Sequence, residues 1–160
     1  MELTLKLKGL MQSYGGSNPW TATRRTELQP TITAVRGLIE CALGLAKVGV
    51  YEEDDVIRQA LWKKVDIEIP TLDHMPEILS DDQIVGALTE DMQFKNAEGK
   101  NMSTAMPQIT KEYIIGESFT VVIKGDEDSV SRIKEYLQHP IYPYCLGRAC
   151  CIPSEPIVVD

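Results

Sequence analysis

The stretch Leu3-Thr4-Leu5-Lys6-Leu7-Lys8-Gly9 sets the fold, because its leucines alternate with polar residues. A period of two places the three leucines on one face of a β-strand and the polar side chains on the other. The chain therefore begins with a strand that buries one face. Two later stretches show the same alternation, Val65 to Ile69, which Pro70 ends, and Phe119 to Ile123, which Gly125 ends.

A first helix is expected from Thr31 or Thr33 onward, since a threonine hydroxyl can cap the first turn. The apolar residues after it recur at helical spacing: Val35, Leu38, Ile39, Ala42, Leu43 and Ala46. Gly37 and Gly44 fall inside this predicted helix, where each costs roughly 1 kcal/mol relative to alanine. The two glycines therefore indicate close packing against a neighbour or a ligand.

Two further helices are predicted from their end signals. Glu52 to Asp55 precede an apolar segment and Lys63-Lys64 follow it, so the charges complement the helix dipole and the acids read as a solvated first turn. Asp126 or Asp128 caps a later helix, which His139-Pro140 ends and whose apolar face is Val130, Ile133 and Leu137.

The order of these elements predicts an α+β domain. With a short final strand at residues 156–159, it fits the β-α-β-β-α-β plan of ferredoxin-like domains. The length suits one domain over residues 1–160. Residues 70–108 do not fit the plan, so we expect them to be a variable insertion, either a hairpin or an irregular segment.

Composition limits the compartment and the chemistry. The chain has no apolar run long enough to span a bilayer, and its first residues lack the order of a secretory signal. The spacing of Cys41, Cys145, Cys150 and Cys151 fits neither a disulfide scaffold nor a zinc site, so reduced thiols in a cytoplasmic protein are expected. A P-loop and a GxGxxG turn are also missing, and we expect no cofactor and no metal.

Two loops combine the residue types that bind single-stranded RNA. The first runs from Gln12 to Pro30, is predicted to be a surface loop, and holds Tyr14, Gly15 and the pair Arg24-Arg25. The second runs from Tyr144 to Pro153. Each offers an aromatic ring for stacking, a glycine for close backbone approach and an arginine for phosphate. Two ordinary turn-rich loops are the alternative interpretation.

The net charge of −8 argues against a freestanding nucleic-acid binder, because such proteins usually present a basic face. The charge is unevenly distributed, however. Residues 1–50 hold 6 basic and 3 acidic residues, residues 51–110 hold 5 and 13, and residues 111–160 hold 5 and 8. The basic N-terminal third suits a chain that binds RNA on one face only and needs neighbouring subunits to hold it firmly.

Three segments resemble a known family. The segment from Lys8 to Gly15 is similar to the N-terminal signature of the CRISPR-associated CasD proteins, the "Cas five" family, in its type I-E-like form. The segment from Pro30 to Gly44 resembles their first helix, and Pro143 to Arg148 resembles their C-terminal "LGR" signature. Ala149 stands where the family commonly has a lysine. The matches occur in the family's order, and residues 70–108 align poorly.

The resemblance implies a RAMP-type domain that is ferredoxin-like, or RNA-recognition-motif-like. It also implies a non-catalytic, RNA-binding subunit of a type I CRISPR Cascade surveillance complex, which acts in antiviral defence. Such a subunit holds the 5′ handle of the crRNA and caps the backbone filament. Its implied partners are the crRNA 5′ handle, the backbone "Cas seven" subunit and the large subunit, with no membrane. A β-hairpin thumb that helps to hold the handle would lie around Asp91 to Gln108.

Carried onto this sequence, the family's RNA-binding positions form three groups. The handle path is lined by Gln12, Ser13, Tyr14 and Gly15. Phosphates are met by Arg24, Arg25 and Arg36. The second wall contains Tyr144, Gly147 and Arg148.

Two alternatives remain open at this point. One branch of the family, the type I-C form, cuts precursor crRNA as a metal-independent endoribonuclease with tyrosine, lysine and histidine. Tyr14 or Tyr51, Lys63 or Lys64, and His74 are available for this chemistry, which needs a base for the 2′-OH and an acid for the leaving oxygen. The other alternative is a ferredoxin-like metabolic or regulatory domain whose loop matches are accidental.

Overall fold

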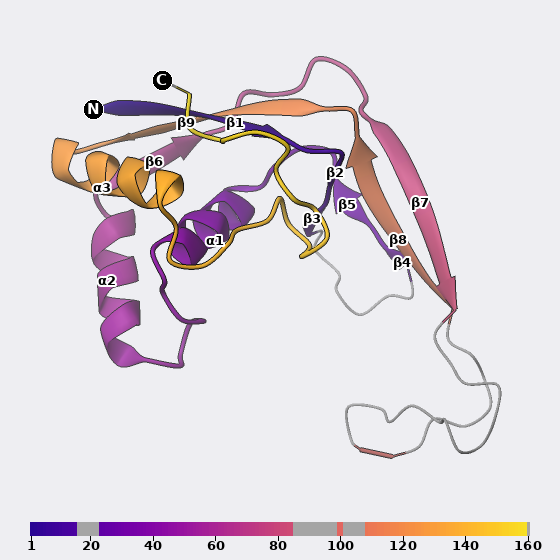
Figure 1. Cartoon of the computed structure of the whole chain (residues 1–160), viewed down its shortest axis with the longest axis horizontal. Coiled ribbons are helices and arrows are strands. Elements are labelled where there is room, and N and C mark those ends of the chain that lie inside the picture. Colours follow the sequence, from indigo (N-terminus) through magenta and orange to yellow (C-terminus); the bar gives the residue numbers. More distant parts are fainter. Residues whose placement is uncertain (16–22, 85–98, 101–107, 160) are drawn as a thin grey trace.

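Two antiparallel strands, β1 (Glu2–Lys8) and β9 (Ser118–Gly125), lie at the centre of the computed structural model, which describes residues 1–15, 23–84, 99–100 and 108–159. Strand β6 (Val65–Glu68) pairs with the other edge of β9 (Figure 1). These are the three strands that the alternation predicts. The side chains that they bury are Leu3, Leu5, Leu7, Val65, Ile67, Phe119, Val121 and Ile123.

The C-terminal segment lies along the free edge of β1. The Lys6 N–H donates to the carbonyl oxygen of Ile157 at 2.7 Å, and the Val159 N–H donates to that of Thr4 at 3.1 Å. The predicted final strand is thus present, reduced to an isolated antiparallel bridge between Val158 and Leu5. The resulting order of C-terminal segment, β1, β9 and β6 confirms the α+β, ferredoxin-like fold class.

Helices α1 (Ile32–Ala42) and α3 (Glu127–Gln138) cover one face of this sheet (Figure 1). The predicted caps are confirmed: the side chain of Thr31 accepts from the Ala34 N–H, and that of Asp126 accepts from the Ser129 N–H. Gly44, expected inside α1, lies instead just beyond its end at φ 76°. A Cβ there would come within 2.8 Å of the Ile141 side chain, so this position needs glycine for both reasons.

The central ribbon continues past the end of β1 without changing register. Lys8 pairs with Ser118, and three residues further along each strand Met11 pairs with Ile115. The second pair belongs to β2 (Met11–Gln12) and β8 (Gln108–Ile115). The strands bend between these pairs at residues 9–10 and 116–117, so the first and third strands of the predicted plan each extend into a second sheet.

Strands also form in the region expected to be a hairpin or an irregular insertion and in the region expected to be a surface loop. Strand β7 (Glu77–Ile84) pairs with β8 along its whole length, and both arms extend away from the helices (Figure 1). The polar stretch after β2 contains β3 (Tyr14–Gly15), β4 (Thr23–Arg24) and β5 (Thr26–Glu27). Strand β4 runs parallel to β8, and β3 pairs with β5. The expected surface loop at Gln12 to Pro30 is therefore partly built into sheets.

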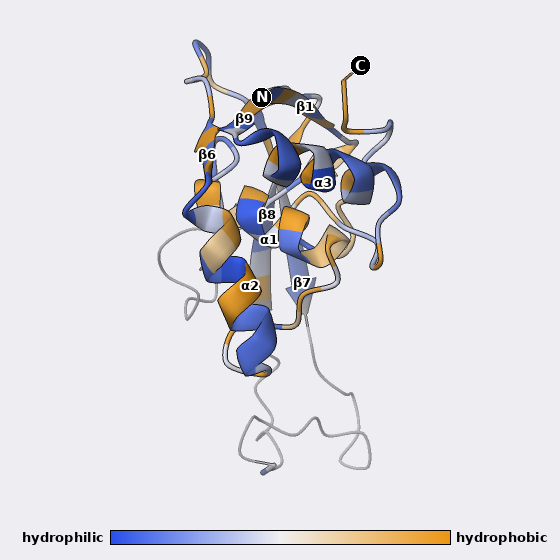
Figure 2. Ribbon diagram, turned by 90° about the vertical axis from the view of Figure 1, so that its left-hand side faces the viewer, coloured by the Kyte–Doolittle hydropathy of each residue, from blue (hydrophilic) through white to orange (hydrophobic). Residues whose placement is uncertain are grey.

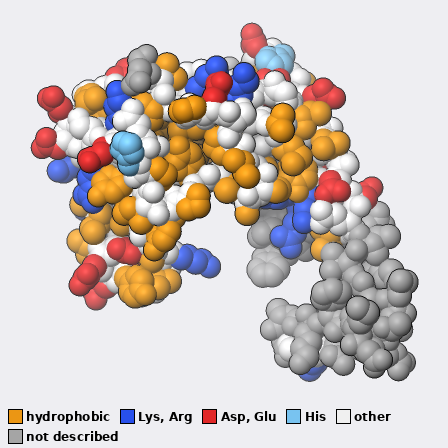
Figure 3. Space-filling model, viewed as in Figure 1, with side chains coloured by type: hydrophobic (Ala, Val, Ile, Leu, Met, Phe, Trp, Pro, Cys, Tyr) orange, Lys and Arg blue, Asp and Glu red, His pale blue; other side chains and the backbone are white. Residues whose placement is uncertain are grey.

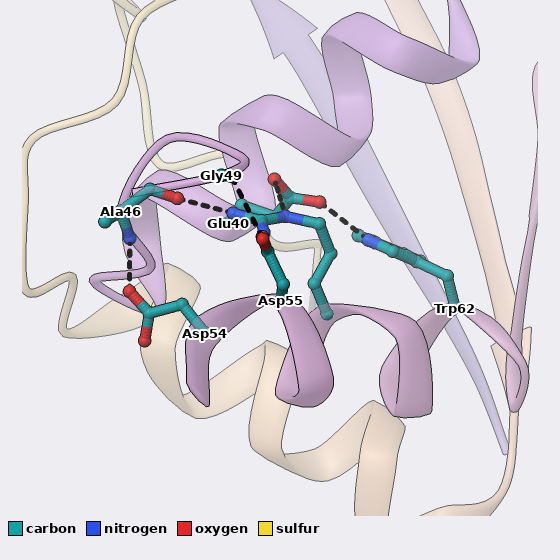
Figure 4. A network of polar contacts seen from close by, with 7 residues as sticks. Glu40, Ala46, Gly49, Asp54, Asp55 and Trp62 are labelled. Carbon is teal, nitrogen blue, oxygen red and sulfur yellow. Dashed lines mark hydrogen bonds and ion pairs between the residues drawn. The ribbon is translucent and has the colours of Figure 1, made fainter. Parts of the chain in front are cut away.

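Helix α2 (Glu52–Trp62) is fastened to α1 by a polar network (Figure 4). Glu40 on α1 accepts from Arg58 Nε at 2.9 Å and from Trp62 Nε1 at 2.7 Å. Asp54 and Asp55 accept backbone N–H groups of the preceding loop, at 2.8 Å and 3.0 Å. The acidic run is thus only partly the solvated first turn that the sequence suggests.

Much of the outer surface of α2 is apolar. Figure 2 shows hydrophobic residues on its visible face, and Val56 is 62% exposed. The loop before the helix adds exposed side chains at Val48, Val50 and Tyr51. None of the described helices is long and apolar enough to cross a bilayer.

Replacement of Leu5 by alanine tests the assignment of the core. Leu5 is fully buried between the helices and the C-terminal segment, so Leu5→Ala should lower the free energy of unfolding by about 2–5 kcal/mol in urea denaturation. Leu10→Ala is the matched control, because Leu10 is 85% exposed and its truncation should change stability by less than about 0.5 kcal/mol. Equal losses for the two variants would contradict the fold.

Candidate nucleic-acid interface

The two motif-bearing loops, about 130 residues apart in sequence, touch each other through their backbones. The Ser13 N–H donates to the carbonyl oxygen of Leu146 at 3.0 Å. Gly147 has φ 99°, and a Cβ built on it would lie 1.6 Å from the carbonyl oxygen of Ser13. Only glycine fits this position, because its backbone is left-handed and packs directly on another backbone. The structure thus brings residues 11–15 and 144–151 into one site.

The second loop is a compact turn with its own hydrogen bonds. Leu146 N–H donates to the Cys151 carbonyl at 2.7 Å, and Cys151 N–H donates back to the Arg148 carbonyl at 2.8 Å. Leu146 and Cys151 are fully buried and anchor the turn. Tyr144 is half-buried, and its hydroxyl donates to the Leu137 carbonyl at the end of α3. The turn therefore has a defined shape independent of any ligand.

Gln12, Ser13 and Tyr14 lie in the interior, with exposed fractions of 0%, 3% and 2%. The Tyr14 hydroxyl donates to Gln12 Oε1 at 2.6 Å, and Gln12 Nε2 donates to the Glu117 carbonyl at 2.8 Å. Burial raises the pKa of Tyr14 and keeps its phenol protonated. These three residues position the backbone of the site, and among the four residues Gln12 to Gly15 only Gly15 is exposed.

Arg148 links the turn to the second sheet. Its Nη1 donates to the Glu112 carbonyl and its Nη2 to the Arg24 carbonyl, both at 2.9 Å. The guanidinium carbon also lies 4.9 Å from the centre of the Tyr113 ring, a cation–π contact. Charge-assisted hydrogen bonds are worth about 1.5–3 kcal/mol each, so Arg148 is a strong tie between three segments.

Arg24 and Arg25 are exposed on this surface. They lie on and just after β4, which the parallel pairing with β8 holds beside Lys111. Figure 3 shows that this side of the molecule is hollowed between the helices and the β7–β8 side, with Lys or Arg side chains on both margins. Exposed guanidinium groups on a fixed strand can pair with phosphate oxygens.

Arg36 occupies a different environment, the contact between α1 and α2. Its guanidinium carbon lies 5.0 Å from the centre of the Trp62 ring. Its Nε is buried and has no hydrogen-bond partner among the described residues. The structure therefore does not place Arg36 in the hydrogen-bonded group that joins Arg24 and Arg148.

Three residues that complete the site received no role from the sequence: Thr26, Glu112 and Tyr113. Thr26 Oγ1 accepts from the Tyr14 N–H at 2.9 Å, and the Thr26 N–H donates to Glu112 Oε2 at 3.3 Å. Tyr113, 4% exposed, supplies the ring under Arg148. The sequence pattern that could have marked these residues as part of the site is weak, because Thr26 lies in a polar stretch and β8 alternates over only a few residues. The contacts that use them depend on strand pairing, which sequence spacing does not reveal.

Three of the residues considered for RNA cleavage, Tyr14, Lys64 and His74, do not converge. Tyr14 is buried, while His74 is bound by Asp73 and Glu117, at 2.8 Å and 2.9 Å. Lys64 lies against Gly125 at one end of β9, and Glu117 precedes the other end. The eight residues of β9 span roughly 24 Å at about 3.4 Å per residue, so Lys64 and His74 cannot act on one bond.

The described residues also lack a cluster of three or more His, Cys, Asp or Glu side chains that could hold a metal ion. The acidic pairs Asp54-Asp55 and Asp81-Asp82 are therefore not parts of such a cluster. Asp81 and Asp82 instead accept hydrogen bonds from neighbouring side chains on the β7–β8 ribbon, at 2.6 Å each.

Comparison with known proteins gives a match over nearly the whole chain. The sequence model of the family described as CRISPR-associated protein (Cas_Cas5) matches residues 2–160. A chain of a solved "CRISPR RNA-guided surveillance complex" superposes with a TM-score of 0.77 at 24% identity, over 99% of this chain and 62% of that one. A chain from "Crystal structure of Cas protein" gives 0.60 at 20% identity, over 100% and 63%. No curated protein matches.

These solved chains share the fold of the present one. The chain spans 62–63% of their length, so each of them has polypeptide beyond the part that it matches.

Gly147→Ala tests the contact between the two loops. The added methyl group would collide with the Ser13 carbonyl, and alanine would have to adopt the left-handed φ of this position, which is unfavourable for it. We therefore expect a loss of about 2–4 kcal/mol in the free energy of unfolding. The matched control is Gly15→Ala, where a Cβ meets nothing within 4 Å and φ is not positive. If Gly147→Ala were as stable as the control in thermal or urea unfolding, the proposed contact would be wrong.

His74 provides a pH-dependent contact near the bend of the ribbon. Its hydrogen bonds to Asp73 and Glu117 raise its pKa above 6.5. Because the raised pKa belongs to the folded state, the stabilisation is fully present below pH 6.5 and is lost as the pH rises through the folded pKa.

NMR titration of the His74 ring checks this expectation. Glu117→Gln removes one carboxylate partner and should lower the His74 pKa, whereas Glu53→Gln, at an exposed position on α2, should leave it unchanged. A His74 pKa that does not respond to Glu117→Gln would rule out the contact.

Proposed function

This chain belongs to the CRISPR-associated Cas5 family, and from that premise we propose that it is a non-catalytic, RNA-binding subunit of a type I CRISPR surveillance complex. In this role it holds the 5′ handle of the crRNA and caps one end of the backbone filament in antiviral defence. The observation that carries the proposal is the pair of exposed arginines on a strand fixed between β8 and the Gly147–Arg148 turn.

The geometry of this surface suits a single strand of RNA. Arg24 and Arg25 offer charge to phosphates, while exposed Gly15, beside which a Cβ would meet nothing within 4 Å, is a point where a backbone can approach closely. Tyr144 is half-exposed at the edge of the same turn and offers part of a ring. The buried residues Gln12 and Tyr14 contribute by fixing the strand on which Gly15 stands.

The distribution of charge supports assembly rather than independent binding. The basic side chains Arg24 and Arg25 lie in the only third of the sequence with a positive balance. The remaining residues carry a large excess of acid, which weakens a lone chain's attraction for RNA. A firm hold on the crRNA therefore requires neighbouring subunits to supply further contacts.

Exposed apolar side chains support contacts with those protein subunits, the backbone "Cas seven" subunit and the large subunit. One group lies on α2 and the loop before it, at Val48, Val50, Tyr51 and Val56. Soluble chains that expose clustered apolar residues usually bury them against a partner. These residues stand away from the Arg24–Arg148 surface, so protein and RNA contacts need not compete.

The β7–β8 ribbon is the base of the proposed thumb. Its two arms pair over eight residues each, from Glu77 with Ile115 to Ile84 with Gln108. The tip expected around Asp91 to Gln108 lies mostly outside the described residues. We propose that residues 70–108 act as the variable insertion within a single domain of residues 1–160.

Co-expression with the other subunits and a CRISPR array tests this function. The tagged chain should co-purify with the other subunits and the crRNA. In a competitive RNA-binding assay, the complex that carries the double variant Arg24→Gln, Arg25→Gln should have roughly 30-fold lower affinity for the RNA. This estimate assumes about 1 kcal/mol for each lost phosphate contact. Arg132→Gln is the control, because it removes one exposed positive charge from α3 on the helical side.

Recovery of the assembled proteins without RNA would contradict the proposal, as would equal binding by the double variant and the control. Site-specific cutting of precursor RNA by the purified chain in EDTA would instead support the nuclease alternative.

A further inference from the structure

We propose that Arg148 is a positioning residue, which holds the strand carrying Arg24 and Arg25 and does not itself serve as a phosphate ligand. The inference rests on the proposed RNA-binding function, because it concerns how the same surface is built. It assigns the arginine of the "LGR" segment a task that its sequence position alone would not suggest.

Two of the five N–H donors of Arg148, one on each terminal nitrogen, are already used within the protein. Nη1 and Nη2 each donate to a backbone carbonyl at 2.9 Å, that of Glu112 on β8 and that of Arg24 on β4. One face of the guanidinium covers the Tyr113 ring at 4.9 Å. A phosphate that took these donors would break the ties between the turn, β4 and β8.

Strand β4 needs such a tie because it is very short. It consists of two residues, and its parallel pairing with β8 comprises Thr23 with Thr110 and Arg24 with Lys111. After it, Thr26 is held by Tyr14 and by Glu112. Arg148 donates to the carbonyl oxygen of Arg24. The backbone that carries Arg24 and Arg25 is therefore held at Arg24 by Arg148 and at Thr26 by Tyr14 and Glu112.

The role requires the shape of arginine and not only its charge. The planar guanidinium can donate to two carbonyl oxygens at once while it stacks on an aromatic ring. Lysine carries the same charge on a single ammonium group and cannot reproduce both hydrogen bonds together with the stacking. Replacement by lysine therefore separates positioning from direct phosphate binding.

The test measures the binding of a labelled single-stranded RNA that begins with the handle of the CRISPR repeat, at several salt concentrations. The assembled protein complex carries the full-length chain as wild type, Arg148→Lys, Arg148→Ala, Arg24→Gln, or Arg148→Ala with Arg24→Gln. Arg132→Ala is the charge-matched control, exposed on α3. Thermal unfolding verifies that each variant is folded. If Arg148→Ala does not fold, the test uses Arg148→Lys alone.

Positioning predicts that Arg148→Lys binds as poorly as Arg148→Ala, despite its charge. It also predicts that Arg24→Gln has little further effect in the Arg148→Ala background, because the Arg24 contact is already lost. The slope of log K against log salt is negative, and its magnitude should decrease by about 1.4 in Arg148→Ala. This is the change expected when two single-strand phosphate contacts, those of Arg24 and Arg25, are lost. Arg132→Ala should leave the slope unchanged.

A direct phosphate ligand behaves differently. Arg148→Lys would then retain most of the binding, the effects of Arg148→Ala and Arg24→Gln would add, and the slope would fall by about 0.7. That pattern would overturn the proposal.

Hydrogen exchange in the free chain distinguishes failure of the inference from failure of the proposed function. Peptides covering residues 23–27 should exchange faster in Arg148→Lys than in wild type and Arg132→Ala. If the wild-type complex binds no RNA, the proposed function fails, while this exchange measurement still tests the tie. Unchanged exchange at residues 23–27 would overturn the positioning role.

Discussion

The close approach of Gly147 to Ser13 is the contact on which the site depends. A left-handed glycine with no side chain lets the C-terminal turn pack against the backbone of Ser13, between β2 and β3. The hydrogen bond from Ser13 to Leu146 fixes that position, and Arg148 then reaches the second sheet. Without this contact the turn could not join β4 and β8, and the exposed arginines would lose one of their supports.

The bent ribbon explains how a small sheet supports this arrangement. Strands β1 and β9 belong to the core, and their continuations β2 and β8 carry the same register into a second sheet. Core packing against α1 and α3 thus determines where β8 begins, and β8 in turn holds β4 and β7. The helices lie on one face of the first sheet, away from β4 and β7, and α2 exposes apolar side chains there. The proposed RNA contacts and protein contacts accordingly use different parts of the chain.

Simple periodicity predicted the parts of the fold with one buried face. The buried side chains of β1, β6 and β9 fall on alternate positions, and Thr31 and Asp126 cap their helices as expected. A hairpin was one expectation for residues 70–108, but the position of β7 could not be predicted, because this strand is rich in acidic and polar residues and no apolar alternation marks it. Gln12 and Tyr14 suggested a surface loop, yet they are buried because each satisfies the polar group of the other. The pairing of distant backbones, on which the site depends, leaves no local pattern in the sequence.

Crosslinking within the assembled complex determines where the crRNA handle lies on this chain. RNA containing photoreactive uridines in the handle would be irradiated in the complex, and the crosslinked peptides of this chain identified by mass spectrometry. We expect crosslinks at residues 11–15, 23–27 and 144–151, where the two loops and the strand that carries Arg24 meet. Crosslinks concentrated on α2 and α3, with none in those three segments, would contradict it.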